Sequence, residues 1–122
     1  MIQIFIPAPK EQKESANWAE RRRHSRHRCM QEIHICRSDG IEIPAMTFEI
    51  SESGMSAATP NYLNIGEHVE LFPILGVWVK AIVRRKVRAM YGFEFLELAE
   101  EQKQGLRDLC AGLPLFQSMA EI

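Results

Sequence analysis

Short segments with β-strand patterning recur roughly every 8–14 residues through most of the chain, and this spacing restricts the fold more than any other feature. Each segment is rich in β-branched or other apolar residues and is bounded by small polar residues, glycine or proline. About six such segments can be marked: 29–38, 41–50, 54–59, 67–73, 76–88 and 89–98. Short strands at this regular spacing are typical of an antiparallel β-barrel or β-sandwich.

Turn signals separate these segments. Ser38-Asp39-Gly40 predicts a hairpin, because Asp-Gly suits tight turns that need a positive φ. Ser51-Glu52-Ser53-Gly54 predicts a second tight turn, and Pro60-Asn61 begins a longer loop. Pro44 has no N–H to donate, so it predicts an edge or a bulge within segment 41–50.

Alternation along the segments predicts which side chains point inward. In the second segment, one face carries Ile41, Ile43, Ala45 and Thr47; in the fifth, one face carries Val77, Val79, Ala81 and Val83. Phe93 and Phe95 share a face of the last segment, and we expect both to be buried, with Trp78 in the core or under a helix. Continued alternation places Arg84, Lys86 and Arg88 on one face of the fifth segment. These side chains could extend an anion-binding surface, but we favour the interpretation that they keep an edge strand soluble.

A helix is predicted after Leu98, because the apolar period changes from two residues to that of a helix. The apolar stripe consists of Leu98, Leu106, Leu109, Cys110 and Leu113. Gly112 and Pro114 are stop signals. We expect an N-terminal extension or linker at 1–18, one domain at 19–113, and a tail at 114–122 that packs back on the domain or forms a dimer contact.

Composition narrows the function classes. The chain has 122 residues, enough for one domain, and no apolar run long enough for a membrane span. Three cysteines and the lack of a signal-peptide pattern favour reduced thiols and a cytoplasmic location. His34 and Cys36 share one strand face while Cys29 lies on the other, so a zinc site is not expected. The chain also lacks nucleophile-elbow and P-loop motifs, so we do not expect an enzyme.

Charge is segregated along the chain although the net charge is only -1. The run Arg21-Arg22-Arg23-His24-Ser25-Arg26 lies where the predicted linker meets the first strand. Arg22 and Arg26 stand four residues apart and can turn toward one ligand in a semi-extended segment. A guanidinium group fits phosphate oxygens or the O6/N7 edge of guanine, and it also stacks on a base. A solvated basic linker and a nucleic-acid patch are the alternative interpretations of this run.

A second motif, Glu49-Ile50-Ser51-Glu52-Ser53-Gly54, falls at the predicted turn between the second and third segments. Small polar turns of this kind can hold phosphates or base edges, and Gly54 allows unusual dihedral angles or a close approach to a ligand. Taken alone, this motif is better explained as an ordinary β-turn.

The two motifs together resemble the PilZ domain family, which is marked by R-x-x-x-R followed about 20–30 residues later by [D/N]-x-S-x-x-G. Here they read Arg22 to Arg26, then Glu49, Ser51 and Gly54, and the resemblance covers roughly residues 19–113. It implies a six-stranded antiparallel β-barrel with a C-terminal helix that binds cyclic di-GMP.

The family resemblance also implies roles for single residues. Arg22 and Arg26 would form the main clamp, with Ser51 and Gly54 as the second wall. An arginine at the position of Arg21 accompanies binding of two stacked ligand molecules in the family. Glu49 departs from the family pattern, although its carboxylate can still accept hydrogen bonds from the guanine N1 and N2 groups.

The function predicted from the sequence is therefore that of a cyclic di-GMP receptor or adaptor without a cofactor. We expect segment 19–28 to be mobile without ligand and to order on binding, which signals to a protein partner. The chain is expected to be a monomer or homodimer. The first alternative is a PilZ-like adaptor that binds no cyclic di-GMP. The less favoured alternative is a small barrel that binds single-stranded nucleic acid, a function that would need several exposed aromatic side chains on one face.

Overall fold

The computed structural model describes residues 24–115, so the expected linker at 1–18 and most of the tail lie outside the described part. The elements within it are β1 (His27–Arg28), β2 (Glu32–Cys36), β3 (Glu42–Ile50), β4 (Gly54–Ala58), β5 (His68–Ile74), β6 (Val77–Val87), β7 (Met90–Phe95) and α2 (Glu100–Ala111). The predicted segments thus become β2 to β7 in the expected order, while the two-residue strand β1 was not predicted separately.

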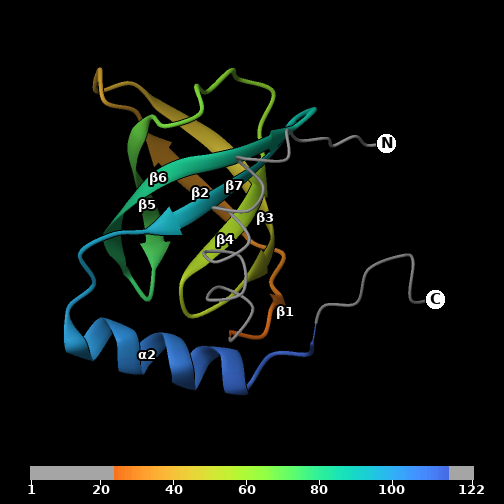
Figure 1. The fold of residues 1–122 in the computed structure, drawn as a ribbon, viewed down its shortest axis with the longest axis vertical. Coiled ribbons are helices and arrows are strands. Elements are labelled where there is room, and N and C mark those ends of the chain that lie inside the picture. Colours follow the sequence, from red (N-terminus) through yellow and green to blue (C-terminus); the bar gives the residue numbers. More distant parts are fainter. Residues whose placement is uncertain (1–23, 116–122) are drawn as a thin grey trace, which may run out of the picture.

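The six longer strands form a closed antiparallel barrel (Figure 1). Their order is β3-β2-β5-β6-β7-β4, and the pairing of β3 with β4 closes the ring. Strand β1 adds to the end of β3, where His27 pairs with Ile50 and Arg28 with Glu49. This arrangement confirms the barrel and decides against the open sandwich.

The barrel interior is filled by the alternating side chains that the sequence pattern identified. Val79, Ala81 and Val83 of β6 are buried, as are Phe93 and Phe95 of β7. Burial of each large apolar side chain contributes about 2 kcal/mol to the free energy of unfolding. The core therefore comes from residues of every barrel strand, which hold the strand ends in a fixed arrangement.

Three expected core positions are instead exposed. Ile41 is 56% exposed and Val77 is 43% exposed, because one precedes β3 and the other begins β6, beyond the enclosed part of the barrel. Trp78 is 40% exposed and points to the outer surface, where its ring lies 4.9 Å from that of Phe72. The expectation that Trp78 lies in the core or under a helix was therefore wrong.

The expected edge at Pro44 is present. Pro44 pairs with His34 of β2, and the pairing of β3 with β4 begins only at Met46. Proline therefore occupies a stretch of β3 with a single neighbouring strand, where the missing N–H breaks no ladder.

Helix α2 lies across one end of the barrel (Figure 1), with Leu106 and Cys110 buried against the core. Burial raises the pKa of the Cys110 thiol, as expected for a core residue. A Cβ at Gly105 would lie 2.7 Å from Leu75 Cδ1, so the glycine inside the helix allows close packing on the β5–β6 turn. No helix in residues 24–115 is both long and apolar enough to cross a membrane.

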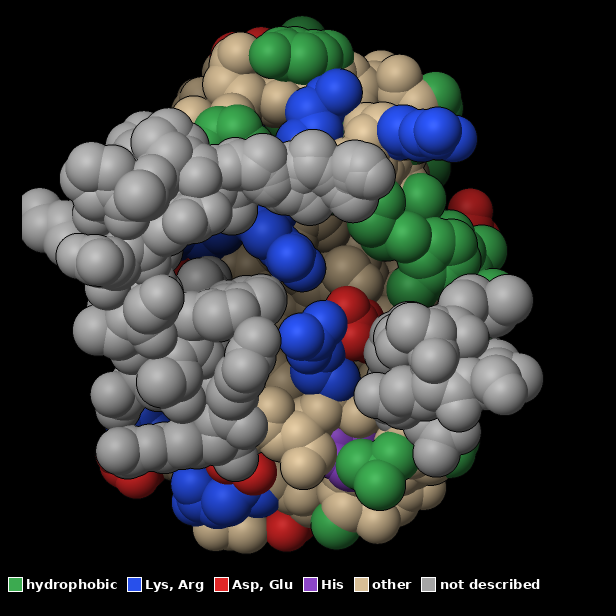
Figure 2. All heavy atoms as spheres, turned by 45° about the vertical axis from the view of Figure 1, so that its right-hand side comes forward, with side chains coloured by type: hydrophobic (Ala, Val, Ile, Leu, Met, Phe, Trp, Pro, Cys, Tyr) green, Lys and Arg blue, Asp and Glu red, His purple; other side chains and the backbone are tan. Residues whose placement is uncertain are grey.

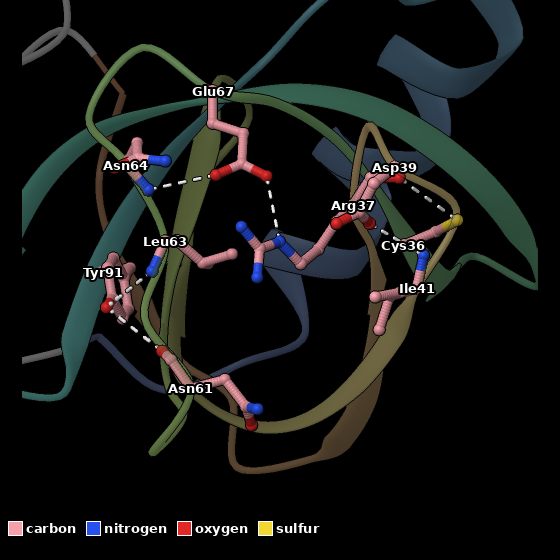
Figure 3. A network of polar contacts seen from close by, with 9 residues as sticks. All are labelled: Cys36, Arg37, Asp39, Ile41, Asn61, Leu63, Asn64, Glu67 and Tyr91. Carbon is pink, nitrogen blue, oxygen red and sulfur yellow. Dashed lines mark hydrogen bonds and ion pairs between the residues drawn. The ribbon is translucent and has the colours of Figure 1, made fainter.

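The long connection between β4 and β5 is fixed by polar contacts from the barrel (Figure 3). The buried Tyr91 hydroxyl accepts a hydrogen bond from Leu63 N at 3.0 Å and donates one to Asn61 O at 3.2 Å. Glu67 accepts hydrogen bonds from Asn64 N and Arg37 Nε at 3.0 and 3.1 Å. These contacts hold the loop at the end of the barrel opposite to α2.

Candidate functional site

The pairing of β1 with β3 brings the arginine segment to the second motif. Arg26 immediately precedes β1, and Glu49 lies in the part of β3 that pairs with it. As a result, Arg26 Nη1 lies 3.3 Å from Glu49 Oε2, although the two residues are 23 positions apart in the chain. Arg26, the last residue of the first sequence motif, therefore lies beside Glu49, the first residue of the second.

A pocket opens on the barrel surface at this meeting point. Its empty space is about 650 Å³, part of it open to solvent. The residues that line it include Arg26, Glu49, Ser51, Ser53, Gly54, Arg84, Arg85, Gly92 and Glu94. On the face seen in Figure 2, lysine and arginine side chains gather near the centre, with acidic atoms beside them.

Four of the six predicted site residues, Arg26, Glu49, Ser51 and Gly54, line this pocket together. Arg21 and Arg22 lie outside the described residues. The clamp role of Arg22 and the link between Arg21 and binding of two stacked ligand molecules therefore stay predictions.

The Ser51 hydroxyl organises the turn between β3 and β4. Its oxygen accepts hydrogen bonds from Ser53 N and Gly54 N, both at 3.2 Å. The backbone closes the same turn, because Ser51 N donates to Gly54 O at 2.8 Å. Ser51 thus shapes the pocket wall through the backbone, a role that a serine in a tight turn commonly plays.

Gly54 is required for the close packing of β4 on β7. A Cβ at this position would lie far inside van der Waals contact with the carbonyl oxygen of Phe93. The sequence pattern indicated a glycine with an unusual conformation or a close approach to a ligand. The close approach in the structure is to the backbone of the neighbouring strand β7.

Glu49 and Arg26 lie at the same rim of the pocket, and Glu49 is the more buried of the two. Its side chain is only 12% exposed, against 45% for Arg26. Its Oε1 atom is buried and has no hydrogen-bond partner within residues 24–115. A buried carboxylate oxygen of this kind is costly unless it accepts a hydrogen bond, so the site favours a ligand that carries N–H donors.

The opposite wall of the pocket comes from β6 and β7 and was not predicted. A bulge between Val83 and Arg85 interrupts the alternation of β6, so Arg84 and Arg85 both line the pocket. Lys86 instead lies over the rings of Tyr62 and Tyr91, at 5.3 and 5.7 Å from their centroids. The expectation of one common face for Arg84, Lys86 and Arg88 was therefore wrong. The run of adjacent basic residues was the sequence signal that could have indicated this cationic wall.

Arg84 is held in place by an acidic neighbour. Its Nε lies 2.6 Å from Glu94 Oε1 on the adjoining strand. The pocket thus has one arginine–glutamate pair at each rim, Arg26–Glu49 and Arg84–Glu94. Planar cations beside hydrogen-bond acceptors suit an anionic ligand with polar aromatic rings.

A metal site is not indicated by the described residues. Within 24–115, no group of three or more histidine, cysteine or acidic side chains is arranged to hold a metal ion. The nearest histidine contact at the pocket is His24 Nε2, which lies 3.9 Å from Glu52 Oε1.

The fold and the pocket define a small β-barrel domain with a cationic surface site at a Ser-x-x-Gly turn and a helix across one end. Residues 20–112 match the PilZ domain model, and the chain belongs to the PilZ domain family. The resemblance and the barrel predicted from the sequence are thereby confirmed. No curated protein sequence matches the chain at a significant level.

Solved PilZ structures share the fold. The PilZ domain of CeSA from a cellulose-synthesizing bacterium is 18% identical, with a TM-score of 0.57 over 71% of this chain and 95% of that one. The PilZ domain of YcgR from Escherichia coli, solved with c-di-GMP, is 20% identical, with a TM-score of 0.59 over 76% and 91%. The Bacillus subtilis inhibitor of motility MotI/DgrA is 24% identical, with a TM-score of 0.58 over 75% and 49%.

Proposed function

We propose that this PilZ domain is a receptor or adaptor that binds cyclic di-GMP in the pocket beside Arg26. The observation that carries the proposal is the meeting of Arg26 and Glu49 with the Ser51–Gly54 turn at one surface pocket. The family membership and the c-di-GMP held by the YcgR domain support it. The proposed activity is recognition of a second messenger, with no catalytic step and no cofactor.

The ligand would be held by complementary charge and hydrogen bonding. Arg26 would contact a phosphate or the O6/N7 edge of a guanine, together with Arg22 and Arg21 from the preceding segment. The buried Oε1 of Glu49 would accept hydrogen bonds from the guanine N1 and N2 groups. Ser51 and Gly54 would act through the shape of the turn that they stabilise.

Signalling would follow from the exchange of partners by Arg26. A ligand phosphate competes with Glu49 for this guanidinium, and β1 directly follows it. Because β1 has only two residues, a shift of Arg26 would reposition the arginine segment and offer a new surface to a cytoplasmic protein partner. We propose a monomer or homodimer as the acting form.

Calorimetric titration of the full chain with cyclic di-GMP tests the proposal. We expect saturable binding whose affinity depends weakly on salt, with a log–log slope of magnitude about 2 or less, because the ligand is a dianion. Chemical shifts of residues 24–28 should move on binding. A steep salt slope with single-stranded DNA or RNA, and no binding of cyclic di-GMP, would favour the nucleic-acid alternative instead.

One observation favours the ligand-free adaptor as a second candidate. The Arg26–Glu49 ion pair already satisfies the arginine without a ligand, and glutamate replaces the family's Asp or Asn. In that case the wild-type chain would show no heat of binding, and residues 24–28 would keep their chemical shifts. The same titration therefore separates the two candidates.

Replacing Glu49 by asparagine is expected to tighten cyclic di-GMP binding about fivefold. The change removes a negative charge beside an anionic ligand and releases Arg26 from its 3.3 Å contact, while an amide oxygen remains as an acceptor. Calorimetry on the wild type and the variant measures the effect. Glu97→Asn is the matched control, because Glu97 is an exposed acid paired with Lys80 outside the pocket. Equal or weaker binding by Glu49→Asn would contradict competition between Glu49 and the ligand.

A further inference from the structure

The wall of the pocket formed by β6 and β7 contains an arginine that lies along the barrel surface. Arg85 pairs with Gly92 of β7 just after the bulge in β6. A Cβ at Gly92 would lie 3.5 Å from both Cβ and Nε of Arg85, which places the arginine side chain in contact with the space above the glycine. The side chain therefore crosses β7 at Gly92, and both residues line the pocket.

Arg84 and Arg85 both line the pocket, but their side chains contact different residues of β7. Arg84 Nε is committed to Glu94 at 2.6 Å and forms part of the rim. Arg85 Nε lies beside the outward side of Gly92, a residue that has no side chain of its own. A planar cation laid along a surface presents a face on which an aromatic base can stack, which an ammonium group cannot do.

The spacing between the strands that carry the two pocket walls indicates how long a ligand must be to contact both walls. Strands β4 and β7 lie between β3 and β6, so the path along the barrel wall from one pocket wall to the other crosses three strand spacings, roughly 14 Å. Long arginine side chains shorten this gap from both sides. A ligand with two purine bases can contact the Arg26 wall with one base and the Arg85 wall with the other.

We propose that Arg85, seated on Gly92, is a second base-recognition residue on which one purine of the bound dinucleotide stacks. This inference rests on the proposed function and adds a role for a residue outside both sequence motifs. The glycine leaves this space on the outward face of β7 open, and a Cβ there would already touch Arg85 at 3.5 Å.

The test is calorimetric titration of the full chain with cyclic di-GMP, using Arg85→Ala and Arg85→Lys. We expect Arg85→Ala to weaken binding about tenfold, the typical effect of losing a stacking partner for one base. Arg85→Lys keeps the charge but loses the planar face, so it should bind within about threefold of Arg85→Ala. Arg107→Ala, which removes an exposed arginine from α2, is the matched control and should bind like the wild type.

The outcomes separate this inference from the proposed function. Wild-type-like binding by either Arg85 variant, while Arg26→Ala loses binding, would overturn the role of Arg85 and leave the receptor function standing. Absence of binding by the wild type would overturn both. Thermal unfolding of each variant should match the wild type, because the side chain of Arg85 lies at the surface.

Discussion

Replacing Arg26 by alanine is expected to weaken cyclic di-GMP binding at least about 30-fold. Arg26 contacts the buried acid of the pocket and leads directly into β1, so its guanidinium is the described cation best placed to exchange Glu49 for a ligand phosphate. Loss of a hydrogen-bonded charge contact costs about 2 kcal/mol, and each 1.4 kcal/mol changes the dissociation constant tenfold. Titration calorimetry measures the change directly.

Arg28→Ala is the control for this prediction. Arg28 is an exposed arginine two residues further along the chain, on β1, and it does not line the pocket. Its replacement lowers the local positive charge by the same amount, so it should weaken binding less than about threefold through long-range electrostatics alone. If both variants lose the same affinity, the segment acts only as a diffuse basic patch, and a specific contact by Arg26 is refuted.

The barrel was predictable because its strands carry a clear period of two. Val79, Ala81 and Val83 point inward as the alternation requires, and the Asp39-Gly40 turn connects β2 to β3. The helix was equally predictable, since Leu106 and Cys110 lie one turn apart on the face that covers the barrel. Such local patterns report burial directly, and burial determines most of this fold.

The second wall of the pocket was not predictable for a physical reason. The bulge after Val83 shifts the register by one residue, and a one-residue shift exchanges the two faces of a strand. Extrapolation of the alternation therefore assigned Arg84 and Lys86 to one face, whereas Arg84 and Arg85 share the pocket. Bulges depend on the pairing of both strands, and a single segment carries little information about that pairing.

The exposed strand ends illustrate the same limit of local patterns. Ile41 and Val77 continue the apolar alternation of their segments, yet they lie at the ends of β3 and β6, where the barrel no longer encloses them. Alternation predicts the face on which a residue lies. Whether that face is covered depends on the lengths of the neighbouring strands.

The structure also separates the two roles that the Ser51–Gly54 motif can play. Serine and glycine at this turn were predicted to contact a ligand, but their described contacts are internal. Ser51 bonds the backbone of its own turn, and Gly54 lets β4 pass close to the Phe93 carbonyl. The motif therefore fixes the position of β3 relative to β7, and this spacing sets the width of the pocket between Glu49 and Arg85.

Gly54→Ala is accordingly expected to destabilise the domain by about 3 kcal/mol, because the added Cβ meets rigid backbone rather than a side chain that could move. For a domain of this size, that loss lowers the unfolding temperature by about 15 °C in a calorimetric or circular-dichroism melt. Gly92→Ala is the matched control, since its Cβ would make ordinary contact with Arg85 and should change the unfolding temperature by less than about 3 °C. Equal melting of Gly54→Ala and the wild type would show that β4 can move away from β7, and the turn would then be a ligand contact rather than the spacer of the pocket.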